Sequence, residues 1–224
     1  FIIIYKKIRI MNLKERLEWA ITPFKNGLTY NVTKTDEFTA DQIRKSAQLQ
    51  EKEWGNKIIG STNNGNWTTL LGETLVFDIL KSLGENPRRP ERKNGYSPDW
   101  ETDKYIYEVK TRNWTTSGTA GEKVLGTMYK YSDIPLSYGK PLKIICVGYQ
   151  EYELSNGTTK IFGENLSNRK QAFLQLAKAF DIEYVKFSEF AKIEIEKIKK
   201  EEKEKKEVHV NNSSDELLPF GCIV

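Results

Sequence analysis

Three polar residues near the middle of the chain have the types and spacing of a metal site. Asp99 follows Pro98, and a short polar turn separates it from Glu108 and Lys110, two residues apart on a predicted strand. Because side chains alternate between the two faces of a strand, Glu108 and Lys110 project from the same face. Two carboxylates and an ammonium group at one place suit a hard divalent cation such as Mg²⁺, which takes carboxylate and water oxygens.

The turn before the strand determines whether Asp99 joins that face. A two-residue turn at Thr102–Asp103 places Asp99 opposite Ile106. Ile106 lies on the same face as Glu108 and Lys110. A four-residue turn keeps this parity, whereas a three-residue turn needs a bulge to restore it. We therefore expect the three polar groups to converge.

Such a group of residues can hydrolyse a phosphodiester. A metal bound by the two carboxylates lowers the pKa of a bound water and stabilises the charge that develops on phosphate. Lys110, a compact point charge, can orient the attacking water or help to deprotonate it. The alternative is a solvated hairpin in which Glu108 and Lys110 form an ordinary ion pair.

The motif resembles that of the PD-(D/E)xK nucleases, a family that includes type II restriction endonucleases, Holliday junction resolvases and DNA repair nucleases. The resemblance rests on Pro98-Asp99 and Glu108-Val109-Lys110 and covers roughly residues 67–149. It implies that Asp99 and Glu108 bind Mg²⁺, or Mn²⁺ in its place, with Val109 among the metal-binding residues. It also implies that Lys110 is the catalytic lysine.

A helix predicted over residues 66–83 and closed by Gly84 adds a fourth candidate. Glu73 lies on or beside its apolar stripe, and a carboxylate facing a core is costly unless it is paired or bound to a metal. The alternative is that Glu73 lies at the edge of the stripe and reaches solvent. Many PD-(D/E)xK nucleases carry an acidic residue on the helix before the motif, and Glu73 is at the matching place.

Candidate DNA contacts flank the motif on both sides. A basic run precedes it, and a stretch rich in Gly, Ser and Thr follows it, where small residues allow a close approach to a backbone. The candidates are Arg88, Arg89, Arg112, Asn113, Trp114 and Lys123. The alternative is an ordinary connection with solvated surface charges.

Composition narrows the chemistry further. The 224 residues are 38% hydrophobic and 12% aromatic, with a formal net charge of +4, which is weak evidence for a nucleic-acid partner by itself. There are two cysteines and one histidine, His209 in a polar tail. These counts argue against a disulfide framework, a zinc site and a histidine-based triad. The carboxylate–metal chemistry is the hydrolytic mechanism that remains.

The hydrophobic pattern predicts an α/β protein with a mixed central β-sheet flanked by α-helices. The resemblance implies that this sheet is restriction-endonuclease-like. The segment 142–149 is a nearly continuous apolar run, typical of a central strand covered on both faces. Thr39 and Gln42 form a capping-box pattern at the start of a helix. The predicted helices are 13–24, 40–54, 66–83, 120–131 and 168–180; the predicted strands are the hairpin 96–111, then 142–149, 160–162 paired across the turn 156–157, and 182–187.

We expect three parts along the chain. Residues 1–10 are an N-terminal extension before Met11, 11–192 form a single PD-(D/E)xK nuclease-like domain, and 193–224 are a charged, flexible tail. A basic arm that adds affinity for DNA is the alternative for the tail. No apolar run approaches the ~20 residues of a membrane span. We expect a soluble protein that is not secreted and has no membrane partner, in the cytoplasm or wherever its target DNA lies.

The resulting hypothesis is a Mg²⁺-dependent endonuclease that cuts double-stranded DNA, sequence-specifically, and leaves 5′-phosphate ends. Cleavage of both strands of a palindrome predicts a homodimer. One alternative is a junction-resolving or DNA repair nuclease of the same fold. Another is a non-catalytic DNA-binding protein.

Overall fold

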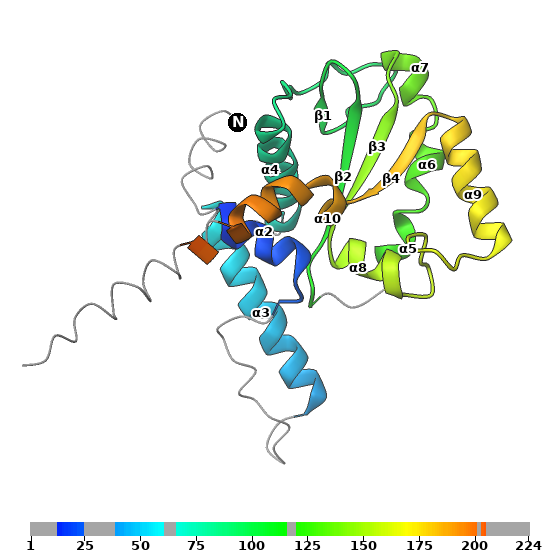
Figure 1. Cartoon of the computed structure of the whole chain (residues 1–224). Helices are drawn as coiled ribbons and strands as arrows, with labels where there is room; N and C mark the ends of the chain where they lie inside the picture. Colours follow the sequence, from blue (N-terminus) through cyan, green and yellow to red (C-terminus); the bar gives the residue numbers. More distant parts are fainter. Residues whose placement is uncertain (1–12, 25–38, 61–65, 116–119, 201–202, 205–224) are drawn as a thin grey trace, which may run out of the picture. The chain divides into compact units, whose positions relative to one another are not determined.

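Figure 1 shows the computed structural model of the chain, which describes residues 13–24, 39–60, 66–115, 120–200 and 203–204. The chain divides into two units, Phe1–Phe190 and Ala191–Val224. The first unit contains the whole β-sheet. In the second, residues 192–200 are helical, and Lys–Glu pairs three or four residues apart lie along this segment at 3.9–4.0 Å. No helix within the described residues is long and apolar enough to cross a lipid bilayer.

A four-stranded mixed sheet forms the centre of the first unit, in the order β1-β2-β3-β4. β1 is antiparallel to β2, whereas β2, β3 and β4 are parallel. The strands are β1 Trp100–Glu101, β2 Ile106–Arg112, β3 Leu142–Gly148 and β4 Ile182–Lys186. The mixed sheet flanked by helices confirms the α/β class predicted from the sequence.

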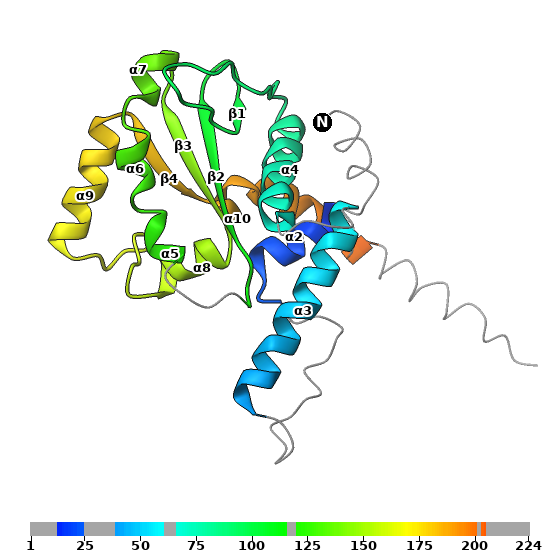
Figure 2. The same ribbon diagram turned by 180° about the vertical axis from the view of Figure 1, so that it is seen from behind.

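Helices cover both faces of the sheet (Figures 1 and 2). One face packs on α2, α4 and α10 and the other on α5–α7 and α9. The helices are α2 Leu13–Ile21, α3 Ala40–Ile59, α4 Trp67–Ser82, α5 Ala120–Lys123, α6 Thr127–Lys130, α7 Ile134–Tyr138, α8 Tyr149–Asn156, α9 Asn168–Ala179 and α10 Phe187–Phe190. Because β3 lies between two parallel strands and between both layers, its apolar residues are fully buried, as its sequence predicts.

Helix α4 brings Glu73 to the sheet, and its C-terminal end is fixed by a specific hydrogen-bonding motif. It closes in a Schellman motif: Gly84, at φ +78°, donates to the Lys81 carbonyl, and the Glu85 amide donates to the Leu80 carbonyl. The prediction that Gly84 closes this helix is confirmed. The Thr39–Gln42 capping box is likewise present at the start of α3, which extends beyond the predicted end to Ile59.

Two predicted elements are wrong. The helix expected over 120–131 is broken into α5 and α6, because the Leu125 and Thr127 amides donate to carbonyls only three residues back, which interrupts the α-helical ladder. The strand expected at 160–162 does not form, since 149–156 is helical. Instead, the Ile161 and Phe162 amides both donate to the Leu154 carbonyl of α8. The Gly- and Asn-rich sequence of residues 60–66 predicts a loop, and this segment lies mostly outside the described residues, apart from Gly60 and Asn66.

Candidate active site

The turn between β1 and β2 has four residues. Glu101 pairs with Ile106 and Trp100 with Tyr107, so the two-residue turn at Thr102–Asp103 is wrong and the four-residue alternative is present. The buried Thr102 hydroxyl accepts from the Lys104 and Tyr105 amides at 3.3 Å, which holds the longer turn. Both turns have the same parity, so the conclusion about the faces is unchanged.

The register continued past Trp100 places Asp99 opposite Glu108. The Asp99 amide donates to the Tyr107 carbonyl at 3.1 Å, and Asp99 Oδ2 accepts from the Val109 amide at 2.7 Å. The second bond ties the carboxylate to the strand that carries Glu108. Both the main chain and the side chain of Asp99 are therefore hydrogen-bonded to β2, which fixes the position of its carboxylate.

Glu108 and Lys110 form a close pair on one face of β2. Lys110 Nζ lies 2.5 Å from Glu108 Oε1, and Glu108 is only 4% exposed. Glu108 Oε2 is buried, and no donor among the described residues lies in hydrogen-bonding geometry to it. Burial first, and then the nearby Glu108 carboxylate, raise the pKa of Tyr131, whose hydroxyl is directed to this site. The strand thus presents a buried carboxylate that pairs with Lys110 and lies close to the Tyr131 hydroxyl.

Glu73 lies on the buried side of α4, as the apolar stripe predicts. It is 8% exposed, and its main-chain carbonyl accepts the Trp100 indole N–H at 2.9 Å. Its carboxylate forms a very short ion pair with Arg89. The alternative in which Glu73 reaches solvent is not what the structure contains.

Arg89 links the acidic residues of the two elements. Its Nη1 donates to the Asp99 main-chain carbonyl at 2.8 Å and lies 3.7 Å from Asp99 Oδ1, while Nη2 binds Glu73. The guanidinium also stacks on Trp100, 4.1 Å from the ring centroid. A residue predicted as a DNA contact is therefore a counterion of the acidic residues Glu73 and Asp99 in this structure, although its side chain is 39% exposed.

The electrostatics of Asp99 reflect this crowding. Burial, and then the Glu108 and Glu73 carboxylates, raise the pKa of Asp99 from 3.8 to about 8, against the lowering effect of the Val109 amide and Lys110. A carboxylate with two like-charged neighbours gains most from a bound cation. This raised pKa and the buried Glu108 carboxylate opposite Asp99 fit a divalent cation held by the two residues.

The fit is not complete in this arrangement. Among the described residues, no three acidic, histidine or cysteine side chains are close enough together to hold a metal ion. Arg89 occupies the carboxylate of Glu73, so Glu73 can reach a shared cation only after Arg89 has moved. Asp99 and Glu108 are thus the two residues that could hold a cation in this arrangement, and Glu73 could join them only after such a movement.

The predicted DNA contacts after β2 are placed differently from expectation. Arg112 is 5% exposed and pairs with Glu153 of α8 at 2.5 Å, beneath the Tyr149 ring. Asn113 is half-buried, and its amide reaches the Thr115 hydroxyl at 3.5 Å. A buried, paired guanidinium joins β2 to α8 and is not presented to a phosphate here.

Trp114 is also fixed inside the protein. Its indole N–H donates to the Trp19 carbonyl at 2.7 Å, and its amide donates to Glu51 at 2.9 Å. Glu51, fully buried on α3, also accepts from the Trp19 indole and from the Thr115 amide. Glu51 anchors the segment after β2, a role that its sequence position did not reveal because its partners are more than 30 residues away.

The remaining candidates lie at the surface. Arg88 is 46% exposed and pairs with Glu101 and Asp103, each at 3.1 Å. Lys123 of α5 is exposed and lines a pocket of about 450 Å³ together with Lys110. Of the six candidate DNA contacts, Arg112 and Lys123 line this pocket beside the Glu108–Lys110 pair, and Lys123 is the exposed one of the two.

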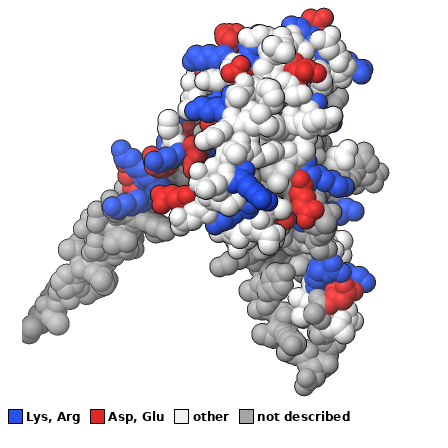
Figure 3. All heavy atoms as spheres, turned by 90° about the vertical axis from the view of Figure 1, so that its right-hand side faces the viewer, with Lys and Arg blue, Asp and Glu red and all other residues white. Residues whose placement is uncertain are grey.

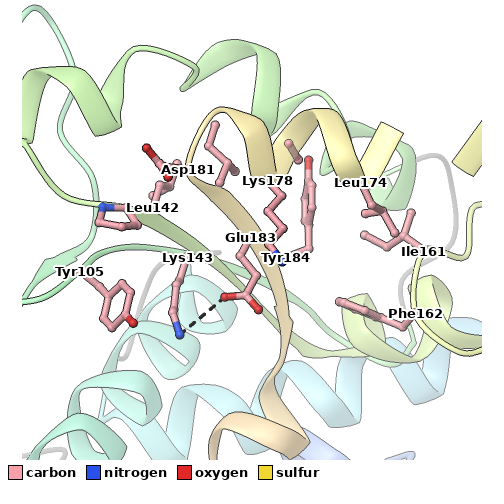
Figure 4. A pocket seen from close by; sticks show the side chains of 13 residues that line it. Tyr105, Leu142, Lys143, Ile161, Phe162, Leu174, Lys178, Asp181, Glu183 and Tyr184 are labelled. Carbon is pink, nitrogen blue, oxygen red and sulfur yellow. Dashed lines mark ion pairs between the residues drawn. The ribbon is translucent and has the colours of Figure 1, made fainter. Parts of the chain in front are cut away.

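A second pocket, of about 420 Å³, lies at the opposite ends of the parallel strands. Figure 4 shows Ile161, Phe162 and Leu174 on one side of it. On the other side Lys143 is directed toward Glu183, 3.6 Å away, and lies 4.2 Å from the Tyr105 ring. This lining is mainly apolar and contains none of the residues of the acidic cluster.

Comparison of the chain with protein-family models, with curated proteins and with solved structures gave no match.

Proposed function

We propose that this protein is a Mg²⁺-dependent endonuclease that hydrolyses phosphodiester bonds of double-stranded DNA. The single observation that carries the proposal is the convergence of Asp99, Glu108 and Lys110 on one face of the β1–β2 pair, with Glu73 linked to them through Arg89. We further propose that the mixed sheet is of the restriction-endonuclease type and that cleavage is sequence-specific.

Each residue has a distinct role in this proposal. Asp99 and Glu108 hold the cation, which when bound lowers the pKa of a water and offsets phosphate charge. Lys110 orients the attacking water and faces the negative charge that develops on the scissile phosphate. The Val109 amide fixes the Asp99 carboxylate, so that both oxygens keep their directions. In-line attack leaves a 5′-phosphate and a 3′-hydroxyl.

Cleavage of long linear DNA with and without Mg²⁺ tests the proposal, with the cut ends sequenced. We expect Asp99→Asn and Lys110→Ala each to lower the rate at least about 100-fold, because each removes a group that acts on the reacting phosphate. Asp103→Asn and Lys104→Ala are matched controls on the same hairpin, since both residues are exposed, and they should cut normally.

The pattern of products separates the competing functions. Discrete fragments from linear duplex support a restriction-type endonuclease. Faster cutting of a four-way junction or of single-stranded DNA would replace it with a junction-resolving or repair nuclease. Metal-independent binding of DNA without any cutting would reduce the protein to a DNA-binding role and overturn the proposed chemistry.

A further inference from the structure

The pocket at the carboxyl-terminal end of β2 has a basic lining. It has a volume of about 450 Å³ and is lined by residues of β2, of the α5–α6 segment and of α8. The lining residues are Lys110, Thr111, Arg112, Lys123, Val124, Gly126, Thr127, Lys130 and Gln150. These described residues include four cationic side chains, with no acidic and no aromatic one. Lys110 and Arg112 are paired with Glu108 and Glu153 outside the lining, whereas Lys123 and Lys130 are exposed. Such a lining selects an anion and offers no ring on which a base could stack.

Gln150 supplies a hydrogen-bond donor that the protein itself does not use. It is 4% exposed at the start of α8, directly after β3, and its Nε2 is buried without a hydrogen-bond partner among the described residues. An unpaired buried amide costs free energy unless a ligand or water accepts from it. Because Gln150 lines the basic pocket, an anion bound there could accept the hydrogen bond from its Nε2.

We propose that this pocket binds a backbone phosphate of the DNA strand, next to the phosphate that is cut, with Gln150 as donor and Lys123 and Lys130 as countercharges. The identity of the strand rests on the proposed function. Lys110 connects the two sites, since it lines the pocket and pairs with Glu108. In open sheets with parallel strands, ligands bind outside the carboxyl ends of the strands, and this pocket lies there.

Fluorescence anisotropy of a labelled 14-base-pair duplex, in EDTA, tests the pocket without cleavage. We expect Gln150→Leu and Lys130→Gln each to weaken binding about five- to tenfold, because a hydrogen bond to a charged group or a phosphate countercharge is lost. Lys178→Gln is the matched control, since this exposed lysine lines the other pocket; its affinity should equal that of the parent.

The salt dependence gives a second measurement that a folding defect does not imitate. Lys130→Gln should reduce the slope of log K against log salt concentration by about 0.9, the value for one phosphate contact, whereas Gln150→Leu should leave the slope unchanged. If Gln150→Leu lowers the melting temperature, Lys130→Gln at its exposed position still provides the test.

Failure of the pocket and failure of the proposed function are distinguishable. Parent-like binding and slopes in both variants would overturn the pocket, even if the protein cuts DNA. A parent protein that binds duplex but never cuts it, while the variants bind weakly, would keep the pocket and remove the nuclease chemistry. A parent that binds no duplex at all overturns the pocket as well.

Discussion

At the scale of single residues, the main feature of the site is the position of Arg89. One guanidinium contacts the carboxylates of Glu73 and Asp99, which come from α4 and from the edge of the sheet. It neutralises part of the charge that a divalent cation would otherwise neutralise. A metal ion bound at the proposed site would therefore compete with Arg89 for Glu73, and this competition can be measured.

We expect Arg89→Met to lower stability in EDTA and to increase the stabilisation by Mg²⁺. The lost guanidinium leaves Glu73 and Asp99 repelling each other, and it also frees Glu73 for the metal. The measurement is the melting temperature in EDTA and at increasing Mg²⁺ concentration. Arg88→Met is the control, because Arg88 pairs with Glu101 and Asp103 of the hairpin. Equal Mg²⁺ responses in both variants would contradict the competition.

The raised pKa of Asp99 predicts how stability depends on pH without metal. Its pKa is 3.8 in the unfolded chain and about 8 in the folded one, so the folded protein keeps a proton that unfolding releases. The contribution of Asp99 to stability is complete below pH 4 and is lost as the pH rises toward about 8.

Asp99→Asn should therefore flatten this pH dependence. In EDTA at pH 8 to 8.5 we expect the variant to be more stable than the parent by on the order of 1 kcal/mol, or 2–4 °C in melting temperature. The difference should shrink toward pH 5. Urea unfolding at several pH values measures it, and a parent less affected by pH than the variant would show that the assigned pKa is wrong.

At the scale of elements, the close approach of α4 to β2 positions Glu73. A Cβ built on Gly72 would lie 1.7 Å from Thr111 Oγ1 and 2.8 Å from Thr111 Cβ. Only glycine fits between this helix and this strand. The same approach brings Glu73, the next residue, over the edge of the sheet where Trp100 donates to its carbonyl.

Gly72→Ala should consequently destabilise the protein by about 1–3 kcal/mol, because the added methyl group forces α4 away from β2. It should also reduce cleavage, since Glu73 moves with the helix. Thr111→Ala in the same chain should recover much of the stability by vacating the space. Thr69→Ala, at an exposed position of α4, is the control and should unfold in urea like the parent.

Prediction from sequence succeeded for elements whose signals are local. The strand at Leu142–Gly148 follows from an apolar run, and the ends of α3 and α4 follow from Thr39, Gln42 and Gly84. The length of the β1–β2 turn was wrong because the Thr102 hydroxyl stabilises a longer turn than the pattern indicated. The prediction of which side chains share a face was still correct, since two- and four-residue turns place Asp99 on the same face.

At the scale of the whole molecule, charge is distributed without one dominant sign. On the face drawn in Figure 3, basic and acidic side chains occur in small groups with wide uncharged areas between them, in keeping with a net charge of only +4. A DNA partner would therefore be attracted by local features such as the basic pocket more than by an overall field.

If the protein cuts both strands of a palindrome, two copies must act together. We expect two protein chains per duplex when an inactive Asp99→Asn variant is bound to DNA carrying the recognition sequence identified from the cut ends. Sedimentation velocity measures the mass of the complex, with a duplex lacking that sequence as the control. One chain per duplex at saturation would indicate nicking of single strands or a different substrate.

The sequence by itself determined that Glu108 and Lys110 share a face, because strand periodicity is a local property of the backbone. It predicted that Asp99 joins them and that Glu73 is buried, and the turn length and the packing of α4 decided both. Only the tertiary structure decided which cations meet these carboxylates. Arg89 pairs with both Glu73 and Asp99, and Arg112 pairs with Glu153. The tertiary structure also decided that Gln150 and Lys130 line the same pocket as Lys110. These contacts join residues from separate elements, and no periodicity records the packing that brings them together.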